Sequence, residues 1–229
     1  MCKLNGTTKA VKQLLREKNV LKMSTKKFVT FGDSWPWGAE LDANQNPFGY
    51  WIAENLGYEF ENCAEEGTSI EHMILQLQKY ISKNKSDTTA LFFITNPIRT
   101  MHYQGGQWLT YRPTGQKTAG HEAYYKYVQS DKLDYHRAQV YMLALQRMCQ
   151  QHKIKDFYLE GWTHIDWSYN GIDKDKIYTQ NATEILDVDL NPRTSELRKY
   201  QDSVYIKPNK YHPNELGHKR IADEMSKWI

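Results

Sequence analysis

Apolar positions along the chain follow two patterns, which alternate from about residue 27 to the C-terminus. Short and nearly continuous apolar runs predict buried strands, and the run from Ala90 to Ile94 is typical of a strand buried on both faces. Strands are expected at residues 27–32, 58–62, 88–95, 154–159 and 204–206. Between them, apolar residues recur three and four positions apart and predict helices at residues 47–56, 70–81, 130–148 and 213–228.

This order predicts the α/β class, because strands separated by helices form a mostly parallel sheet with helices on both faces. Such sheets bind ligands at the carboxyl ends of their strands. Two helix starts also carry local signals. Thr68 and Glu71 fit a capping box, and Pro213 suits the beginning of the last helix.

Two segments, residues 97–128 and 161–202, are longer than an ordinary connection. We interpret them as functional lids or small subdomains inserted into a single domain that spans residues 24–229. Residues 1–23 are basic and polar, and we interpret them as a leader that is either a short amphipathic helix, disordered or not native. Met23 is then an alternative start.

The composition narrows the class of protein. Apolar residues make up 40% and charged residues 25% of the 229 residues, as in soluble globular proteins. No apolar stretch approaches the ~20 residues that span a bilayer, and no secretory signal is visible. The net charge of +3 comes from scattered lysines, which argues against nucleic acid as a partner.

Cysteine usage predicts a reducing, cytoplasmic setting. Cys2, Cys63 and Cys149 form no close pair, and one thiol is left over in any disulfide scheme. No spacing of cysteine and histidine resembles a zinc site, so we expect neither a metal nor another cofactor.

The strongest candidate for chemistry is the turn at residues 31–38, which reads Phe-Gly-Asp-Ser-Trp-Pro-Trp-Gly. Gly32 permits a sharp turn after the first strand, and Ser34 then lies at the carboxyl end of that strand, where a nucleophile is accessible. The alternative is an ordinary strand-to-helix turn that Asp33 and Ser34 cap. The serine gains a catalytic meaning only if other segments supply a base and an oxyanion hole.

Three other strand ends supply such residues. Gly67 comes after the second strand, Asn96 after the third, and His212 after the last. The carboxyl ends of parallel strands meet at one edge of the sheet, so these residues are expected on the same rim as Ser34. Singly, each one has an ordinary explanation as a turn or helix-start residue.

The four segments together resemble the blocks of the SGNH (GDSL) hydrolase family, in order and placement, over residues 27–229. The matching blocks are Gly32-Asp33-Ser34 with Gly38, residues 62–69, Thr95-Asn96, and His212-Pro213. The resemblance implies a flavodoxin-like three-layer α/β/α sandwich around a mostly parallel five-stranded sheet. It also implies that Ser34 is the nucleophile and His212 the general base. The implied oxyanion hole consists of the N–H groups of Ser34 and Gly67 and the side-chain amide of Asn96.

The chain departs from this family at two positions. The family has an aspartate three residues before the histidine, where this chain has Asn209. A neutral Asn209 can accept a hydrogen bond from the imidazole but cannot balance its charge. The site is therefore either a Ser–His dyad or draws on another carboxylate, Asp202 or Asp166. The second departure is Ile94, where the family has a glycine.

The function expected from this resemblance is a serine esterase that acts through an acyl-enzyme on a small-molecule or carbohydrate ester. Carbohydrate O-deacetylation is mildly favoured, because the insertions are rich in aromatic and polar residues and lack aliphatic runs. Trp35, Trp37 and Trp108 are candidates for the walls of the substrate cleft. The alternatives are an acyltransferase with the same residues, and a binding module that keeps the fold but has lost activity.

Overall fold

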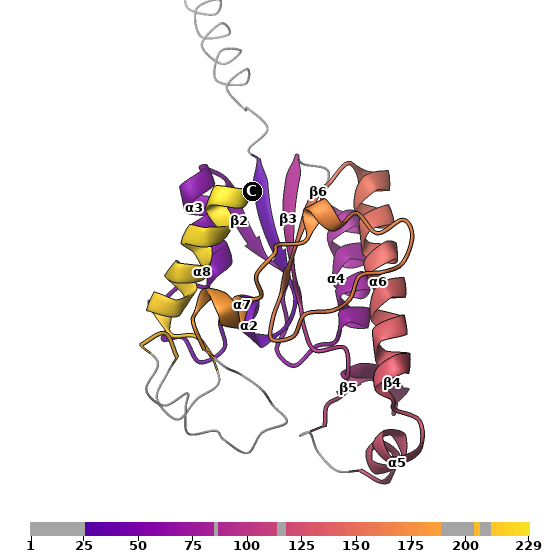
Figure 1. Ribbon diagram of the computed structural model, residues 1–229. Coiled ribbons are helices and arrows are strands. Elements are labelled where there is room, and N and C mark those ends of the chain that lie inside the picture. Colours follow the sequence, from indigo (N-terminus) through magenta and orange to yellow (C-terminus); the bar gives the residue numbers. More distant parts are fainter. Residues whose placement is uncertain (1–25, 85–86, 114–117, 189–203, 207–211) are drawn as a thin grey trace, which may run out of the picture.

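The computed structural model describes residues 26–84, 87–113, 118–188, 204–206 and 212–229, and its central feature is a parallel sheet (Figure 1). The sheet contains β1 (Lys27–Phe31), β2 (Glu59–Asn62), β3 (Thr88–Ile94) and β6 (Lys155–Glu160), in the spatial order β2-β1-β3-β6. All three pairings are parallel. The predicted α/β class with a parallel sheet is confirmed, and the observed strand order is that of flavodoxin-like folds.

Two helical layers cover the sheet, as Figure 1 shows. α3 (Phe48–Leu56) and α8 (Glu215–Trp228) lie against one face, and α4 (Ile70–Lys83) and α6 (Asp131–His152) lie against the other. β3 is buried along its whole length, and its side chains alternate between the layers. Phe93 packs with the α3 and α8 side, whereas Phe92 packs with the α4 and α6 side.

The predicted fifth strand at residues 204–206 is not a strand. Val204 and Tyr205 form a turn, and Ile206 makes only an isolated bridge to Pro213. A proline has no N–H to donate, so this bridge cannot continue as a ladder. The described part of the sheet therefore has four strands rather than five.

The predicted capping box at the start of α4 is also wrong, because tertiary contacts take both of its side chains. Ser69 is the N-cap residue. The Thr68 hydroxyl instead donates to the backbone oxygens of Gly32 and Glu65. The Glu71 carboxylate accepts from the Met101 amide and from the Tyr141 hydroxyl, both at 2.5 Å. Glu71 thereby fastens the first insertion to the helical layer.

The two insertions contain small elements of their own. Residues 97–128 include the antiparallel hairpin of β4 (Thr100–Gln104) and β5 (Gln107–Tyr111), followed by α5 (Ala119–Tyr127). The described part of residues 161–202 contains a 3₁₀ turn, η1 (Lys174–Lys176), and the short helix α7 (Ala182–Ile185). None of the helices in the described ranges has the length and apolar character needed to cross a membrane. The leader at residues 1–23, Asp202 and Asn209 lie outside the described residues.

Candidate active site

We call the turn at residues 31–38 the serine turn. It contains a glycine, Gly32, whose backbone conformation and close neighbours leave no room for a side chain. Gly32 has φ +142°, and a Cβ atom there would lie 2.8 Å from Pro36 Cγ and 2.9 Å from Phe93 Cβ. The chain then enters the four-residue helix α2 (Ser34–Trp37), which ends at Gly38 with φ +87°. This sharp reversal places Ser34 directly beyond the carboxyl end of β1.

Neighbouring segments hold the peptide groups of Gly32. The side-chain amide of Gln76 on α4 accepts from the Gly32 N–H and donates to its carbonyl oxygen, both at 3.3 Å. The Thr68 hydroxyl donates to the same carbonyl at 3.0 Å. The serine turn is thus joined to the segment that carries Gly67.

Asp33 joins the serine turn to the end of β3. Its side chain is fully buried, and Oδ1 accepts from the Trp35 amide at 3.1 Å. Its Oδ2 accepts from the Thr95 hydroxyl and from Arg99 Nη1, each at 2.8 Å. The same Arg99 nitrogen donates to the Thr68 carbonyl at 3.2 Å, and its guanidinium lies 5.2 Å from the Trp162 ring centre. One ion pair therefore connects three of the four segments that the sequence singled out.

The candidate oxyanion donors belong to these connected segments. Neither the N–H of Ser34 nor that of Gly67 has a hydrogen-bond acceptor among the described residues. Asn96 Oδ1 accepts from the Ile98 amide at 3.0 Å, which leaves the Nδ2 group of the side chain to donate elsewhere. Gly67 has φ +76°, and a Cβ atom there would lie 3.1 Å from the guanidinium of Arg112, a residue that follows β5.

The imidazole of His212 lies beside a carboxylate that the sequence did not single out. His212 Nδ1 is 3.2 Å from Glu40 Oε2, with 18% and 28% of the two side chains exposed. The two atoms are close enough for an ion pair but are not aligned as a hydrogen bond. In the described part of the chain, no hydrogen bond joins His212 to Ser34 and no ion pair joins it to Asp166.

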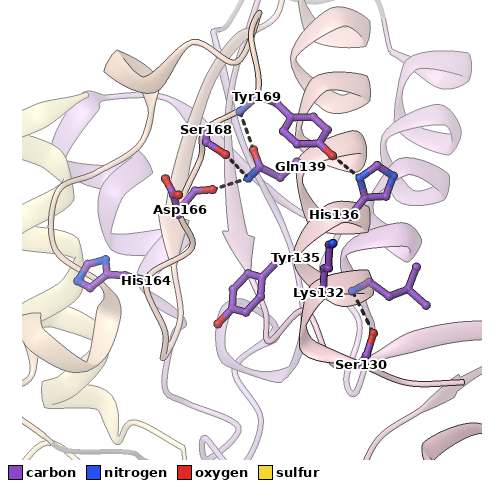
Figure 2. Close-up of a pocket in the computed structure, with 10 residues that line it drawn as sticks. Ser130, Lys132, Tyr135, His136, Gln139, His164, Asp166, Ser168 and Tyr169 are labelled. Carbon is purple, nitrogen blue, oxygen red and sulfur yellow. Dashed lines mark hydrogen bonds between the residues drawn. The ribbon is translucent and has the colours of Figure 1, made fainter. Parts of the chain in front are cut away.

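Asp166 was predicted as an alternative acid, but the structure places it elsewhere. It follows β6 and lines a cavity of about 770 Å³ between the first half of α6 and residues 164–169. In Figure 2, Gln139 bridges this cavity wall, because its amide donates to the Asp166 carbonyl and accepts from the Tyr169 amide. Neither Ser34 nor His212 lines the cavity. No pattern in the sequence predicts this cavity, because its two sides lie on separate elements.

Three tryptophans were predicted to form walls of the substrate cleft, and for Trp35 this prediction is wrong. Its ring is only 1% exposed and packs against Phe93 and Trp162 in the core, so it is not available to a substrate. Trp37, within the serine turn, is 49% exposed, and Trp108 is 53% exposed on β5. These two rings remain accessible.

Cys63, Cys149 and His218 are poorly suited to act as a nucleophile or a base. Burial raises the pKa of Cys63 to about 12 and raises that of Cys149 further, so both remain thiols at neutral pH. His218 on α8 is fully buried, and its Nδ1 accepts from the Phe48 amide at 3.1 Å. Burial, with the nearby His212, lowers the pKa of His218 to about 3, so this imidazole stays neutral.

Two residues of the candidate site, Glu40 and Arg99, are not predicted by any pattern in the sequence. Arg99 is three residues beyond Asn96, and an arginine near the end of a buried strand offers only a weak signal. The sequence contains no signal for Glu40, because no motif or spacing relates this residue to His212. Its backbone does carry a signal in the structure, since its φ of +66° is uncommon for a residue other than glycine.

Comparison with known proteins identifies the fold. No protein-family profile matches the chain, and no curated protein sequence matches it. Solved structures do match. A protein assigned to the lipolytic G-D-S-L family from Desulfitobacterium hafniense DCB-2 gives a TM-score of 0.54 at 14% identity, over 89% of this chain and 99% of its own. A crystal structure of TesA gives 0.53 at 9% identity, over 88% of this chain and 97% of its own.

A third match is the psychrotrophic esterase EstA from Pseudoalteromonas sp., in a structure inhibited by monoethylphosphonate. Its TM-score is 0.50 at 11% identity, over 88% of this chain and 97% of its own. The chain therefore has the fold of the SGNH hydrolases, a parallel sheet between two helical layers. At identities this low the likeness defines the fold, and the chemistry has to be argued from the site.

Proposed function

We propose that the protein is a serine ester hydrolase that acts through an acyl-enzyme, with Ser34 as nucleophile and His212 as general base. The single observation that carries this proposal is the hydrogen-bond network around Asp33. Through Thr95 and Arg99, the network links the serine turn to the segments that hold Asn96 and Gly67. These are the segments that an esterase needs side by side, because the nucleophile and the oxyanion donors must meet at one carbonyl group.

The reaction follows from these roles. Ser34 Oγ attacks the ester carbonyl carbon while His212 takes the hydroxyl proton. The negative charge that develops on the carbonyl oxygen is stabilised by the N–H groups of Ser34 and Gly67 and by Asn96 Nδ2. The tetrahedral intermediate collapses, the ester C–O bond breaks, and His212 returns the proton to the leaving alcohol. Water then attacks the acyl-enzyme by the same steps and releases the carboxylic acid.

Within this class we favour an O-acetyl group on a carbohydrate as the substrate. The supporting observation is the pair of exposed rings, Trp37 within the serine turn and Trp108 on the first insertion. Exposed aromatic rings offer flat apolar faces on which sugars stack. Transfer of the acyl group to another alcohol would use the same residues, and product analysis with added alcohols distinguishes it from hydrolysis.

Hydrolysis of p-nitrophenyl acetate by the wild type and by Ser34→Ala tests the proposal. We expect turnover in the wild type and a loss of roughly 10³-fold or more in the variant, because only the oxyanion donors then remain. A fluorophosphonate probe should label Ser34 in the wild type only, a choice guided by the phosphonate inhibition of EstA. A folded wild-type protein with neither turnover nor labelling would identify a binding module instead.

A further inference from the structure

Glu40 lies where the third member of a catalytic triad belongs. Its carboxylate approaches Nδ1 of His212, which leaves Nε2 on the opposite side of the ring for the Ser34 proton. In serine hydrolases the acid that faces Nδ1 fixes the tautomer and orientation of the imidazole and stabilises the imidazolium. The distance of 3.2 Å is an ion-pair distance. Loose alignment is common in free enzymes, in which catalytic hydrogen bonds tighten only when substrate binds.

The backbone connects Glu40 rigidly to the nucleophile. The carbonyl oxygen of Ser34 accepts from the amides of Gly38 and Ala39, at 3.2 Å and 2.9 Å. The Leu41 amide then bonds to the Gly38 carbonyl at 3.1 Å, which closes a tight turn with Glu40 at its third position. The carboxylate is therefore held at a fixed place relative to Ser34, only six residues away in the sequence.

The conformation of Glu40 is the second observation. Its φ of +66° falls in the left-handed region, and the third position of such a turn normally takes glycine or asparagine. A glutamate there costs stability that a glycine would not. Strain of this kind persists where the side chain has a task, and this carboxylate lies within ion-pair distance of His212.

We infer that Glu40 is the acidic positioning residue of a Ser34–His212–Glu40 triad. This inference rests on the proposed function. It explains how the chain works with a neutral Asn209 at the position where the SGNH family has an aspartate. The acid comes from the loop that follows the nucleophile instead of from the segment that carries the histidine.

The test compares Glu40→Gln, Glu40→Asp and Glu40→Gly with the wild type, by kcat and KM for p-nitrophenyl acetate. We expect Glu40→Gln to lower kcat roughly 10- to 100-fold, with KM little changed. This is less than the ~10⁴-fold loss from the same kind of change in a hydrogen-bonded triad, because these two atoms are not aligned as a hydrogen bond. Glu40→Asp should recover part of kcat, because it restores the charge.

Glu40→Gly separates the catalytic role from a structural one. Glycine relieves the backbone strain, so the thermal midpoint should equal or exceed that of the wild type while kcat falls as in Glu40→Gln. The matched control is Glu184→Gln, which neutralises a glutamate that pairs with a different histidine, His164, at 2.9 Å. This control should leave kcat unchanged.

The outcomes separate the two proposals. If the fluorophosphonate labels Ser34 and Glu40→Gln keeps kcat within threefold of the wild type, the inference about Glu40 is wrong and the esterase stands. The same holds if kcat falls only in proportion to the folded fraction. If wild-type Ser34 is neither labelled nor active, the proposed function itself has failed.

Discussion

The serine turn and the segment that presents His212 are held in place in different ways. Asp33 at the heart of the serine turn is fully buried and accepts three hydrogen bonds. His212 is partly exposed and meets the rest of the described site through one ion pair with Glu40. Beside it, the Asn214 amide bonds to the Tyr205 carbonyl, and Pro213 forms the bridge to Ile206.

This difference predicts that substitutions in the two regions affect stability and activity differently. The proposed nucleophile is positioned by the core, so changes around it should affect stability and activity together. The proposed base is positioned by a contact near the surface, so changes around it should affect activity with little cost in stability. Three predictions test this contrast, from the largest expected effect to the smallest.

Arg99→Met should have the largest effect, because it leaves the Asp33 carboxylate buried without its cation. We expect a loss of about 3–5 kcal/mol in the free energy of unfolding, measured by urea denaturation. We also expect kcat of the folded protein to fall roughly 10- to 100-fold, since small displacements of a nucleophile have effects of that size.

Arg137→Met is the matched control for this change. Arg137 pairs at 2.6 Å with Asp134 on α6, and both side chains are nearly as little exposed as in the Arg99–Asp33 pair. Arg137→Met should lower the free energy of unfolding about as much as Arg99→Met does, but it should leave kcat unchanged. Equal kcat in the two variants would show that the Arg99 ion pair supports the fold without positioning Ser34.

The pH dependence of stability tests the helix that follows His212. The pKa of His218 is about 3 in the folded protein, below the ordinary value of 6.5. The unfolded chain therefore takes up a proton that the folded protein does not, and stability falls as the pH drops from 6.5 towards 3. This contributes a slope of about 1.4 kcal/mol per pH unit within that window.

His218→Asn keeps an acceptor for the Phe48 amide but removes the titration. Urea denaturation at pH 7 and pH 5 should therefore show a smaller acid-induced loss in the variant than in the wild type, whatever the variant costs at pH 7. Equal acid-induced losses in the variant and the wild type would mean that His218 takes up a proton in the folded protein as readily as in the unfolded chain.

Asn209→Asp should have the smallest effect. It restores the aspartate that the SGNH family has three residues before the histidine. If Glu40 already supports the imidazole, we expect kcat for p-nitrophenyl acetate to change less than threefold. The same substitution in the Glu40→Gln background should raise kcat, because the site then lacks an acid. A large gain in the wild-type background would instead point to a site without a working acid.

The pattern of the chain was enough to predict the layers of this fold and the end of the sheet at which the serine turn lies. The apolar residues of β3 form an uninterrupted run, and those of α4 and α6 recur at helical spacing. Both patterns can be read from the sequence, because buried positions require apolar residues. Gly32 and Gly67 were recognisable for a similar reason, because a positive φ selects glycine. The turn at residues 204–206 was not predictable, since a short apolar run suits a strand as well as a turn that buries only one of its residues, here Ile206.

Tertiary structure decided what the side chains do once these elements meet. Thr68 and Glu71 are good capping residues by spacing, but the nearby Gly32 carbonyl and the Met101 amide took their hydrogen bonds. Trp35 became a core residue because α2 turns it towards Phe93. The sequence determined which strand ends come together, because local burial and backbone geometry fix them. Only the folded chain placed Glu40 beside His212, because a contact between residues so far apart in sequence depends on how the intervening elements pack.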